Sequence, residues 1–195
     1  MTFPRPRAIV IGASAGGFQA LRTLFPVFPE GFPVPILVVQ HQPTHGSGPR
    51  GCSLLALHCR LPVREAMDKE PIQSGHIVFA PPGYHLLVEP DFTLALSTDP
   101  AIHHSRPAID VLFETASDVY QAGLIGVLLT GASQDGTAGL QKIRQRRGMT
   151  LVQDPQSAES PFMPRYAIAH GAADQVLPLS AIALTLKQLG NVQHE

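Results

Sequence analysis

Three short, almost wholly apolar runs constrain the fold of this 195-residue chain most strongly. They lie at residues 8–11, 34–40 and 124–129, and glycine, histidine or threonine ends each run abruptly. Runs of this length and composition are typical of strands that are buried on both faces of a parallel sheet. Apolar residues recur at helical spacing between the runs, as in 18–25 and 107–122. The sequence therefore predicts an α/β fold, with a mainly parallel, doubly wound sheet and helices on both of its faces.

Shorter patterns fill in the rest of this architecture. A pair of apolar segments, 85–88 and 92–96, flanks Glu89-Pro90-Asp91 and predicts a short antiparallel hairpin. The segment 41–50 is rich in glycine, proline and histidine and predicts a loop. Further strands are expected at 62–66, 76–80 and 150–153, and further helices at 53–59, 136–147, 163–170 and 179–189. Because no repeat or linker interrupts this pattern, residues 1–195 are expected to form one domain.

Composition excludes several classes of function. Hydrophobic residues make up 44% of the chain, which is a globular value, and the formal net charge is −1. That charge gives no basic footprint for nucleic acid, and no apolar run approaches the ~18 residues of a membrane span. Cys52 and Cys59 are expected to be free thiols, which is typical of a cytoplasmic protein.

Residues capable of chemistry follow the three apolar runs. Ser14 stands in the turn after the first run, His41 follows the second, and Asp135 follows the third. The carboxyl ends of parallel strands meet at one edge of a sheet, where ligands bind. A serine, an imidazole and a carboxylate at that edge would supply a nucleophile, a base and a group that orients the base. Each residue also has a plainer interpretation: Ser14 as a turn residue or helix cap, His41 as a solvated loop residue, and Asp135 as the N-cap of the next helix.

The turn around Ser14 offers candidate oxyanion donors and must also be weighed against other kinds of site. Backbone N–H groups of Ala15 and Gly16, at the start of the next helix, are candidates to stabilise an oxyanion. A dinucleotide loop is disfavoured, because Ser14 replaces its middle glycine and no acidic residue ends the second strand. The elbow of α/β-hydrolases has the chain order Ser, acid, His, whereas the candidates here run Ser, His, Asp. No cofactor is expected, and a metal site is disfavoured because the loop histidines, His41, His45, His103 and His104, lack a tight ligand spacing.

Three motifs together resemble the catalytic domain of the chemotaxis protein-glutamate methylesterases, the CheB family. They are Ile11-Gly12-Ala13-Ser14-Ala15-Gly16-Gly17, Val39-Gln40-His41, and the segment 129–140 with Thr130-Gly131 and Asp135-Gly136. Shorter matches are 78–86, 106–113, 153–155 and 162–164. The resemblance implies that Ser14 is the nucleophile, His41 the base and Asp135 the triad carboxylate. It also implies hydrolysis of glutamate γ-methyl esters on chemoreceptors, with deamidation of glutamine as a related reaction.

The chain departs from the family pattern in places that bear on substrate and regulation. Ala132 and Ser133 stand where the family has methionine and glycine, and these residues, with Met163, are candidates for the substrate cleft. Residues 43–51 contain many helix breakers and are expected to form a mobile loop over the site. Only seven residues precede Ala8, so we expect no receiver domain and control, if any, by a regulator in trans. The partner is expected to be a methylated chemoreceptor or a receptor-like signalling protein; a catalytically silent binding module and a small-molecule serine esterase are the alternatives.

Overall fold

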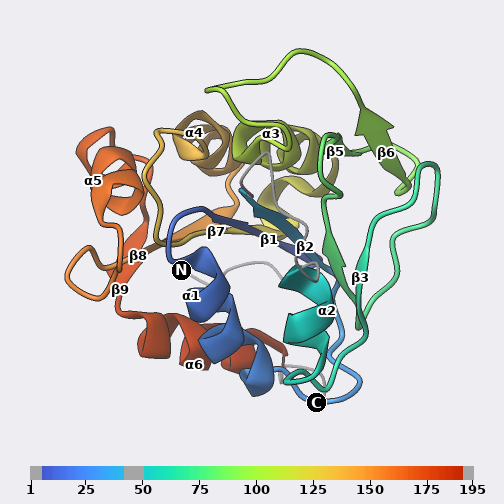
Figure 1. Cartoon of the computed structure of the whole chain (residues 1–195), viewed down its shortest axis with the longest axis horizontal. Coiled ribbons are helices and arrows are strands. Elements are labelled where there is room, and N and C mark those ends of the chain that lie inside the picture. The colour runs from blue at the N-terminus through green and yellow to red at the C-terminus, as the bar shows by residue number, and fades with distance from the viewer. Residues whose placement is uncertain (1–5, 42–50, 191–195) are drawn as a thin grey trace.

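A computed structural model describes residues 6–41 and 51–190, and its centre is a seven-stranded sheet (Figure 1). The strand order is β3-β4-β2-β1-β7-β8-β9, and every neighbouring pair is parallel. The strands are β1 (Ala8–Ala13), β2 (Ile36–Gln40), β3 (Val63–Glu65), β4 (Ile77–Phe79), β7 (Leu124–Leu128), β8 (Met149–Gln153) and β9 (Gln175–Leu177). After β1 the chain builds one half of the sheet, then returns to β1's other side with β7, so a topological switch lies at the centre.

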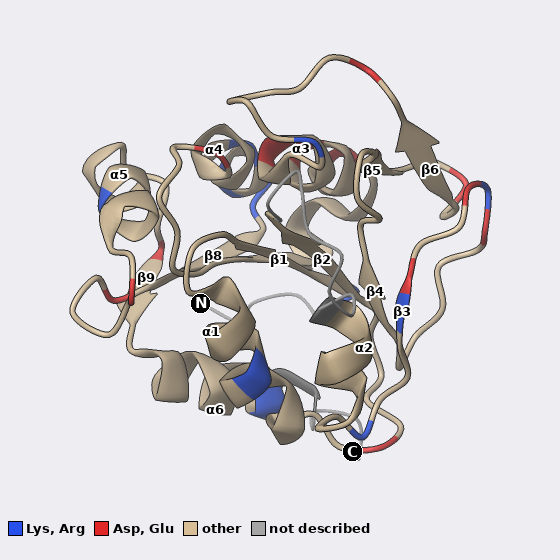
Figure 2. Ribbon diagram, viewed as in Figure 1, with Lys and Arg blue, Asp and Glu red and all other residues tan. Residues whose placement is uncertain are grey.

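Helices cover both faces of this sheet (Figure 1). They are α1 (Gly17–Leu24), α2 (Gly51–Ala56), α3 (Ile109–Tyr120), α4 (Thr137–Gln145), α5 (Phe162–Ala169) and α6 (Leu179–Gly190). In Figure 1, α1, α2 and α6 lie below the sheet, and α3, α4 and α5 lie above it. The predicted α/β fold with a doubly wound parallel sheet is therefore confirmed. Lys, Arg, Asp and Glu are spread over several helices and loops, and no helix is uniformly basic (Figure 2).

The alternation of side chains along β1 explains why its sequence is a continuous apolar run. Ile9 and Ile11 belong to the hydrophobic cluster shared with α1 and α6, whereas Val10 belongs to the cluster shared with α3 and α4. All six residues of β1 are buried, because each face of the strand meets a layer of helices. Removing this apolar surface from water is the main term that holds the three layers together.

The predicted hairpin is present as β5 (His85–Val88) and β6 (Leu94–Ser97), which pair antiparallel. Leu86, Val88 and Leu94 join the cluster on the α3 side, so the hairpin extends that layer. Buried His85 accepts a hydrogen bond from the N–H of Ala108 and contacts the carbonyl of Pro100, at 3.1 and 3.2 Å. These contacts fix both ends of the segment that leads into α3.

Two details of the fold differ from the sequence-based expectations. Strand β9 was not anticipated, and α2 begins at Gly51 and ends at Ala56 rather than running over 53–59. The expected loop at 41–50 lies, apart from His41, outside the described residues.

Cys52 and Cys59 are free thiols, the first buried and the second half-buried. No helix within residues 6–41 and 51–190 combines the length and apolar character that a membrane crossing needs.

Candidate active site

Ser14, His41 and Asp135 follow the carboxyl ends of β1, β2 and β7, which are neighbours in the sheet. Ser14 and His41 line a pocket of about 920 Å³ at this edge. Asp135 lies behind the wall of the pocket and is fully buried. All three predicted residues therefore lie at one edge of the sheet, although only Ser14 and His41 reach the pocket.

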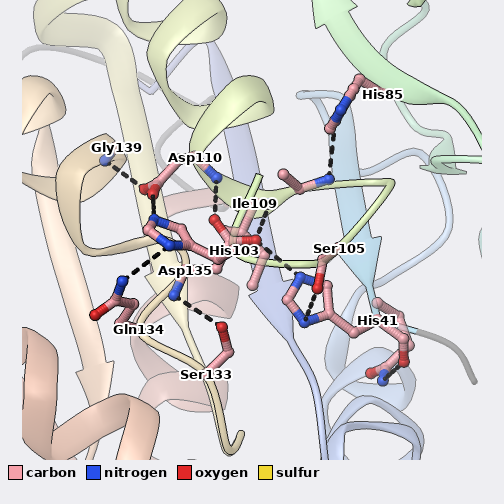
Figure 3. A network of polar contacts seen from close by, with 12 residues as sticks. His41, His85, His103, Ser105, Ile109, Asp110, Ser133, Gln134, Asp135 and Gly139 are labelled. Atoms are coloured by element: carbon pink, nitrogen blue, oxygen red, sulfur yellow. Dashed lines mark hydrogen bonds and ion pairs between the residues drawn. The ribbon is translucent and has the colours of Figure 1, made fainter. Parts of the chain in front are cut away.

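The imidazole of His41 is hydrogen-bonded to the carboxylate of Asp135 (Figure 3). Nε2 of the ring lies 2.8 Å from Oδ2 of Asp135. The same carboxylate accepts hydrogen bonds from the backbone N–H groups of Ile109, at 2.6 Å, and of Asp110, at 2.9 Å. These N–H groups belong to the first turn of α3, which has no side-chain cap of its own. Asp135 therefore caps α3 from a distant loop and fixes the orientation of His41 at the same time.

The electrostatics of Asp135 follow from these contacts. Burial raises the pKa of this carboxyl, but hydrogen bonds from His41 and from the two N–H groups of α3 outweigh it. The pKa of Asp135 therefore lies below its usual value, and the group is anionic at neutral pH. The plainer interpretation of Asp135 as the N-cap of the following helix is wrong: the N-cap residue of α4 is Gly136, and α4 has no side-chain cap.

The second ring nitrogen of His41 faces a residue that the sequence did not single out. Nδ1 lies 3.5 Å from Oγ of Ser105, in the loop before α3 (Figure 3). No hydrogen bond joins Ser14 and His41 among the described residues, and Oγ of Ser14 has no partner there. Because Nε2 is occupied by Asp135, Nδ1 is the nitrogen that is left to exchange a proton with a hydroxyl in the pocket.

The backbone around Ser14 is held in a tight turn. Its N–H donates to the carbonyl of Thr130 at 3.0 Å, and its carbonyl accepts from the N–H of Gly17 and from Nε2 of Gln40, both at 2.8 Å. Gly16 adopts a left-handed conformation with φ of 76°, and a Cβ on Gly17 would lie 2.1 Å from Oε1 of Gln40. Both glycines are therefore required by the turn that exposes Ser14.

The expected oxyanion donors are free to act. The N–H groups of Ala15 and Gly16 donate to no carbonyl in the described part of the chain, and both residues line the pocket. They precede the first turn of α1, whose dipole favours a developing negative charge. This geometry is compatible with the expected role.

Thr130 ties together the loops that carry the site. Its Oγ1 donates to the carbonyl of Ala15 at 2.9 Å and accepts from the N–H of Ser160 at 2.8 Å. Its N–H donates to Oε1 of Gln153 at 2.9 Å. One buried threonine thus connects the Ser14 turn, the loop after β7 and the segment before α5. Thr130 belongs to the third sequence motif, but these contacts could not be anticipated from spacing.

The three residues expected in the substrate cleft have different positions. Ala132 and Ser133 line the pocket, and the hydroxyl of Ser133 accepts from the N–H of Asp135 at 3.1 Å. Met163 is fully buried and does not line the pocket, because it packs against Gly131 beneath the loop. Exposed Phe162, the residue before it, faces the pocket instead.

Further polar residues of the pocket wall were not expected from the sequence. His103, Gln134 and Glu159 line the pocket, and Nε2 of Gln134 lies 2.9 Å from Nδ1 of His103. Nε2 of His103 lies 3.5 Å from Oδ2 of Asp110, a second buried carboxylate (Figure 3). Within residues 6–41 and 51–190, no group of three or more His, Cys, Asp and Glu side chains is arranged to hold a metal ion. His45, one of the loop histidines weighed above, lies outside the described residues.

Comparisons with known proteins agree with this architecture. Residues 9–186 match the family model described as CheB methylesterase. A relative from Leptospira interrogans is 49% identical over 176 residues, which cover 90% of this chain and 91% of the relative. The protein-glutamate methylesterase/protein-glutamine glutaminase of Symbiobacterium thermophilum is 39% identical, over 91% of this chain but only 49% of its own length.

A solved structure shows the same fold. The crystal structure of the Thermotoga maritima CheB methylesterase catalytic domain superposes with a TM-score of 0.89 and 34% identity. The match covers 94% of this chain and 98% of that domain. The family model and these relatives span nearly all of the sheet and its helices, so this chain belongs to the CheB methylesterase family.

Proposed function

We propose that this chain is a serine esterase that hydrolyses glutamate γ-methyl esters on chemoreceptors or receptor-like signalling proteins. One observation carries the proposal: His41 is oriented by a buried, anionic Asp135 at 2.8 Å in the wall of a pocket that also contains the unpaired hydroxyl of Ser14. Membership of the CheB methylesterase family and the names of the relatives support the choice of substrate. Glutamine deamidation is the same acyl transfer with ammonia as the leaving group.

The chemistry follows from the positions of the groups. Oγ of Ser14 attacks the ester carbonyl while its proton passes to Nδ1 of His41, and Asp135 stabilises the imidazolium through Nε2–H. The N–H groups of Ala15 and Gly16 receive the negative charge of the tetrahedral intermediate. His41 then gives the proton to the departing methoxide oxygen as the C–O bond breaks, and methanol leaves. Water, activated by the same nitrogen, hydrolyses the acyl-enzyme to glutamate and free Ser14.

The setting of the reaction is also a proposal. The free thiols of Cys52 and Cys59 are in keeping with a reducing compartment, so we place the reaction in the cytoplasm. Exposed Phe18 and Phe162 line the pocket and offer apolar surface to a protein substrate. A receptor segment that projects one methylated side chain between them would bring the ester to Ser14.

The deciding experiment measures methanol release from a receptor cytoplasmic fragment that has been methylated in vitro. Wild-type protein is expected to release methanol, and Ser14→Ala to release none while keeping its thermal midpoint. Hydrolysis of a simple aryl ester without methanol release would indicate the small-molecule esterase instead. Binding of the fragment without turnover of either substrate would indicate a silent module. Ammonia release from an unmethylated fragment with receptor glutamines tests deamidation.

A further inference from the structure

A second carboxylate–imidazole pair, Asp110 and His103, lies beside the candidate triad and has no part in the mechanism above. Asp110 is the second residue of α3, and its backbone N–H already donates to Oδ1 of Asp135 at 2.9 Å. Its own carboxylate is buried and accepts a hydrogen bond from the N–H of Gly139 in α4 at 2.7 Å. Oδ2 of Asp110 faces Nε2 of His103, which lines the pocket (Figure 3).

Two buried carboxyl groups so close together do not both ionise easily. Asp135 has three donors, from His41, Ile109 and Asp110, and keeps its negative charge. Asp110 has one backbone donor, and its burial together with the charge of Asp135 raises its pKa to about 7. The proton that the pair retains therefore resides on Asp110, and it is lost close to neutral pH.

Among the described residues around Asp110, His103 presents a ring nitrogen, Nε2, to the carboxylate. The groups that face it are Asp135 from the loop after β7, Glu114 on α3, the N–H of Gly139 on α4, and His103 from the loop before α3. The first two disfavour the Asp110 carboxylate, and the last two favour it. Gln134 holds Nδ1 of His103, so that Nε2 points toward Asp110.

We propose that Asp110 and His103 form a second carboxylate–imidazole pair. Through this pair, a group bound in the pocket against His103 changes the charge on Asp110, which lies directly behind Asp135. Asp110 is a positioning residue, since it acts on His41 only through Asp135. When Asp110 loses its proton, a second negative charge strengthens the stabilisation of the His41 imidazolium. A substrate group that contacts His103 alters this charge from the pocket side. The inference rests on the proposed triad for its catalytic meaning, but the pairing can be tested without turnover.

The test is a pH titration of the intact protein by NMR, with ¹³C in the aspartate carboxyl groups and ¹⁵N in the histidine rings. We expect the Asp110 carboxyl to titrate near pH 7 and the His41 ring nitrogens to show an inflection at that same pH, besides their own titration. In Asp110→Asn, which keeps an acceptor for Gly139, this inflection is lost. A His41 titration with a single inflection, unchanged in Asp110→Asn, would overturn the proposal.

His103→Asn provides an independent arm that leaves the buried carboxylate intact. Asparagine tolerates the positive φ of 50° at this position but is too short to reach Asp110. The Asp110 inflection is then expected to move upward by on the order of half a unit, because the ring nitrogen that faces the carboxylate and favours its charged form is gone. Glu114→Gln is the matched control and should move the inflection downward. If His103→Asn leaves the inflection in place, the pairing is refuted even where Asp110→Asn fails to fold. Because no activity is measured, this failure is distinguishable from failure of the proposed esterase.

Discussion

His41 contacts Asp135 through Nε2 and turns Nδ1 toward Ser105, so the ring has one nitrogen bound to the carboxylate and one beside a hydroxyl. The proposed proton transfer from Ser14 uses this same Nδ1, so Ser14 would have to replace Ser105 as its partner when substrate binds. Catalytic hydrogen bonds are often long in unliganded sites and tighten only with substrate, which is in keeping with this arrangement.

The two serines on either side of His41 can be distinguished by covalent labelling. A serine-directed fluorophosphonate is expected to modify Ser14, whose turn places it beside the free N–H groups of Ala15 and Gly16, and not Ser105, whose own N–H donates to the carbonyl of Ile102. Intact-mass analysis should show one adduct on wild type and on Ser105→Ala, and none on Ser14→Ala. An adduct on Ser14→Ala that disappears in Ser105→Ala would make Ser105 the nucleophile.

Asp135→Asn is expected to lower kcat by about 10⁴. The amide oxygen of asparagine can still accept from the N–H of Asp110, but an NH₂ group in place of Oδ2 faces Nε2 of His41 and the N–H of Ile109. His41 must then carry its proton on Nδ1, where it cannot accept one from Ser14. Aryl ester or receptor hydrolysis gives kcat, and circular dichroism checks the fold. Asp118→Asn, an exposed carboxylate on α3 that pairs with Lys142, is the control and should keep full activity. A loss below tenfold in Asp135→Asn contradicts the role of Asp135.

Thr130→Val keeps the shape of the side chain but removes the hydroxyl that joins Ala15 and Ser160. We expect the free energy of unfolding to fall by about 1–3 kcal/mol, because a buried donor and acceptor lose their partner. We also expect kcat to fall, since the Ser14 turn loses its tie to the loop after β7. Urea denaturation and ester hydrolysis measure the two effects. Thr23→Val is the control: it removes an exposed hydrogen bond within α1 and should change neither the free energy of unfolding nor kcat. If both substitutions have equal effects, Thr130 does not hold the Ser14 turn in place.

Asp110 is expected to make stability depend on pH near neutrality. Its folded pKa, about 7, lies above the unfolded value of about 3.9, so its protonated form stabilises the fold at low pH. This contribution is present below the unfolded pKa and is lost as pH rises through the folded pKa, at up to about 1.4 kcal/mol per unit. Asp135, with its lowered pKa, stays ionised across this range and adds no slope of its own.

Asp110→Asn does not titrate, so its stability relative to wild type should rise between pH 5 and pH 8. Urea denaturation at both values measures the difference. Asp91→Asn is the control, because the Asp91 carboxyl lies at an exposed turn and hydrogen bonds from Thr93 lower its pKa. This variant should show no such change in stability between pH 5 and pH 8. A difference between Asp110→Asn and wild type that is the same at both pH values would mean that Asp110 is ionised throughout.

Much of the fold could be predicted from the sequence, because buried parallel strands and amphipathic helices have distinct patterns. The strands that carry the site are continuous apolar runs, and because they pair parallel, their carboxyl ends bring Ser14, His41 and Asp135 to one edge. Strand β9 could not be predicted because it has only three residues, of which Val176 is exposed at the rim of the sheet. So short a segment carries no period that distinguishes it from a loop.

The partners of the site residues could not be predicted in the same way. Local sequence favours Asp135 as a cap of the helix that follows it, whereas its donors lie on α3, 25 and 26 residues earlier. His103 and Ser105 lie in a loop with no secondary-structure pattern, and long-range contacts such as those of His85 hold that loop beside the pocket. Such long-range pairings depend on how layers pack, and spacing along the chain does not encode them.

The position of the site-bearing strands within the sheet has a consequence for how this protein can diversify. β1, β2 and β7 are interior strands, and β3 and β9 form the two rims. Insertions at a rim disturb only backbone groups that already lack a neighbour on one side, so they leave the interior register untouched. The rims and the hairpin layer can therefore acquire new recognition segments while the arrangement of the site at the interior strands is inherited unchanged.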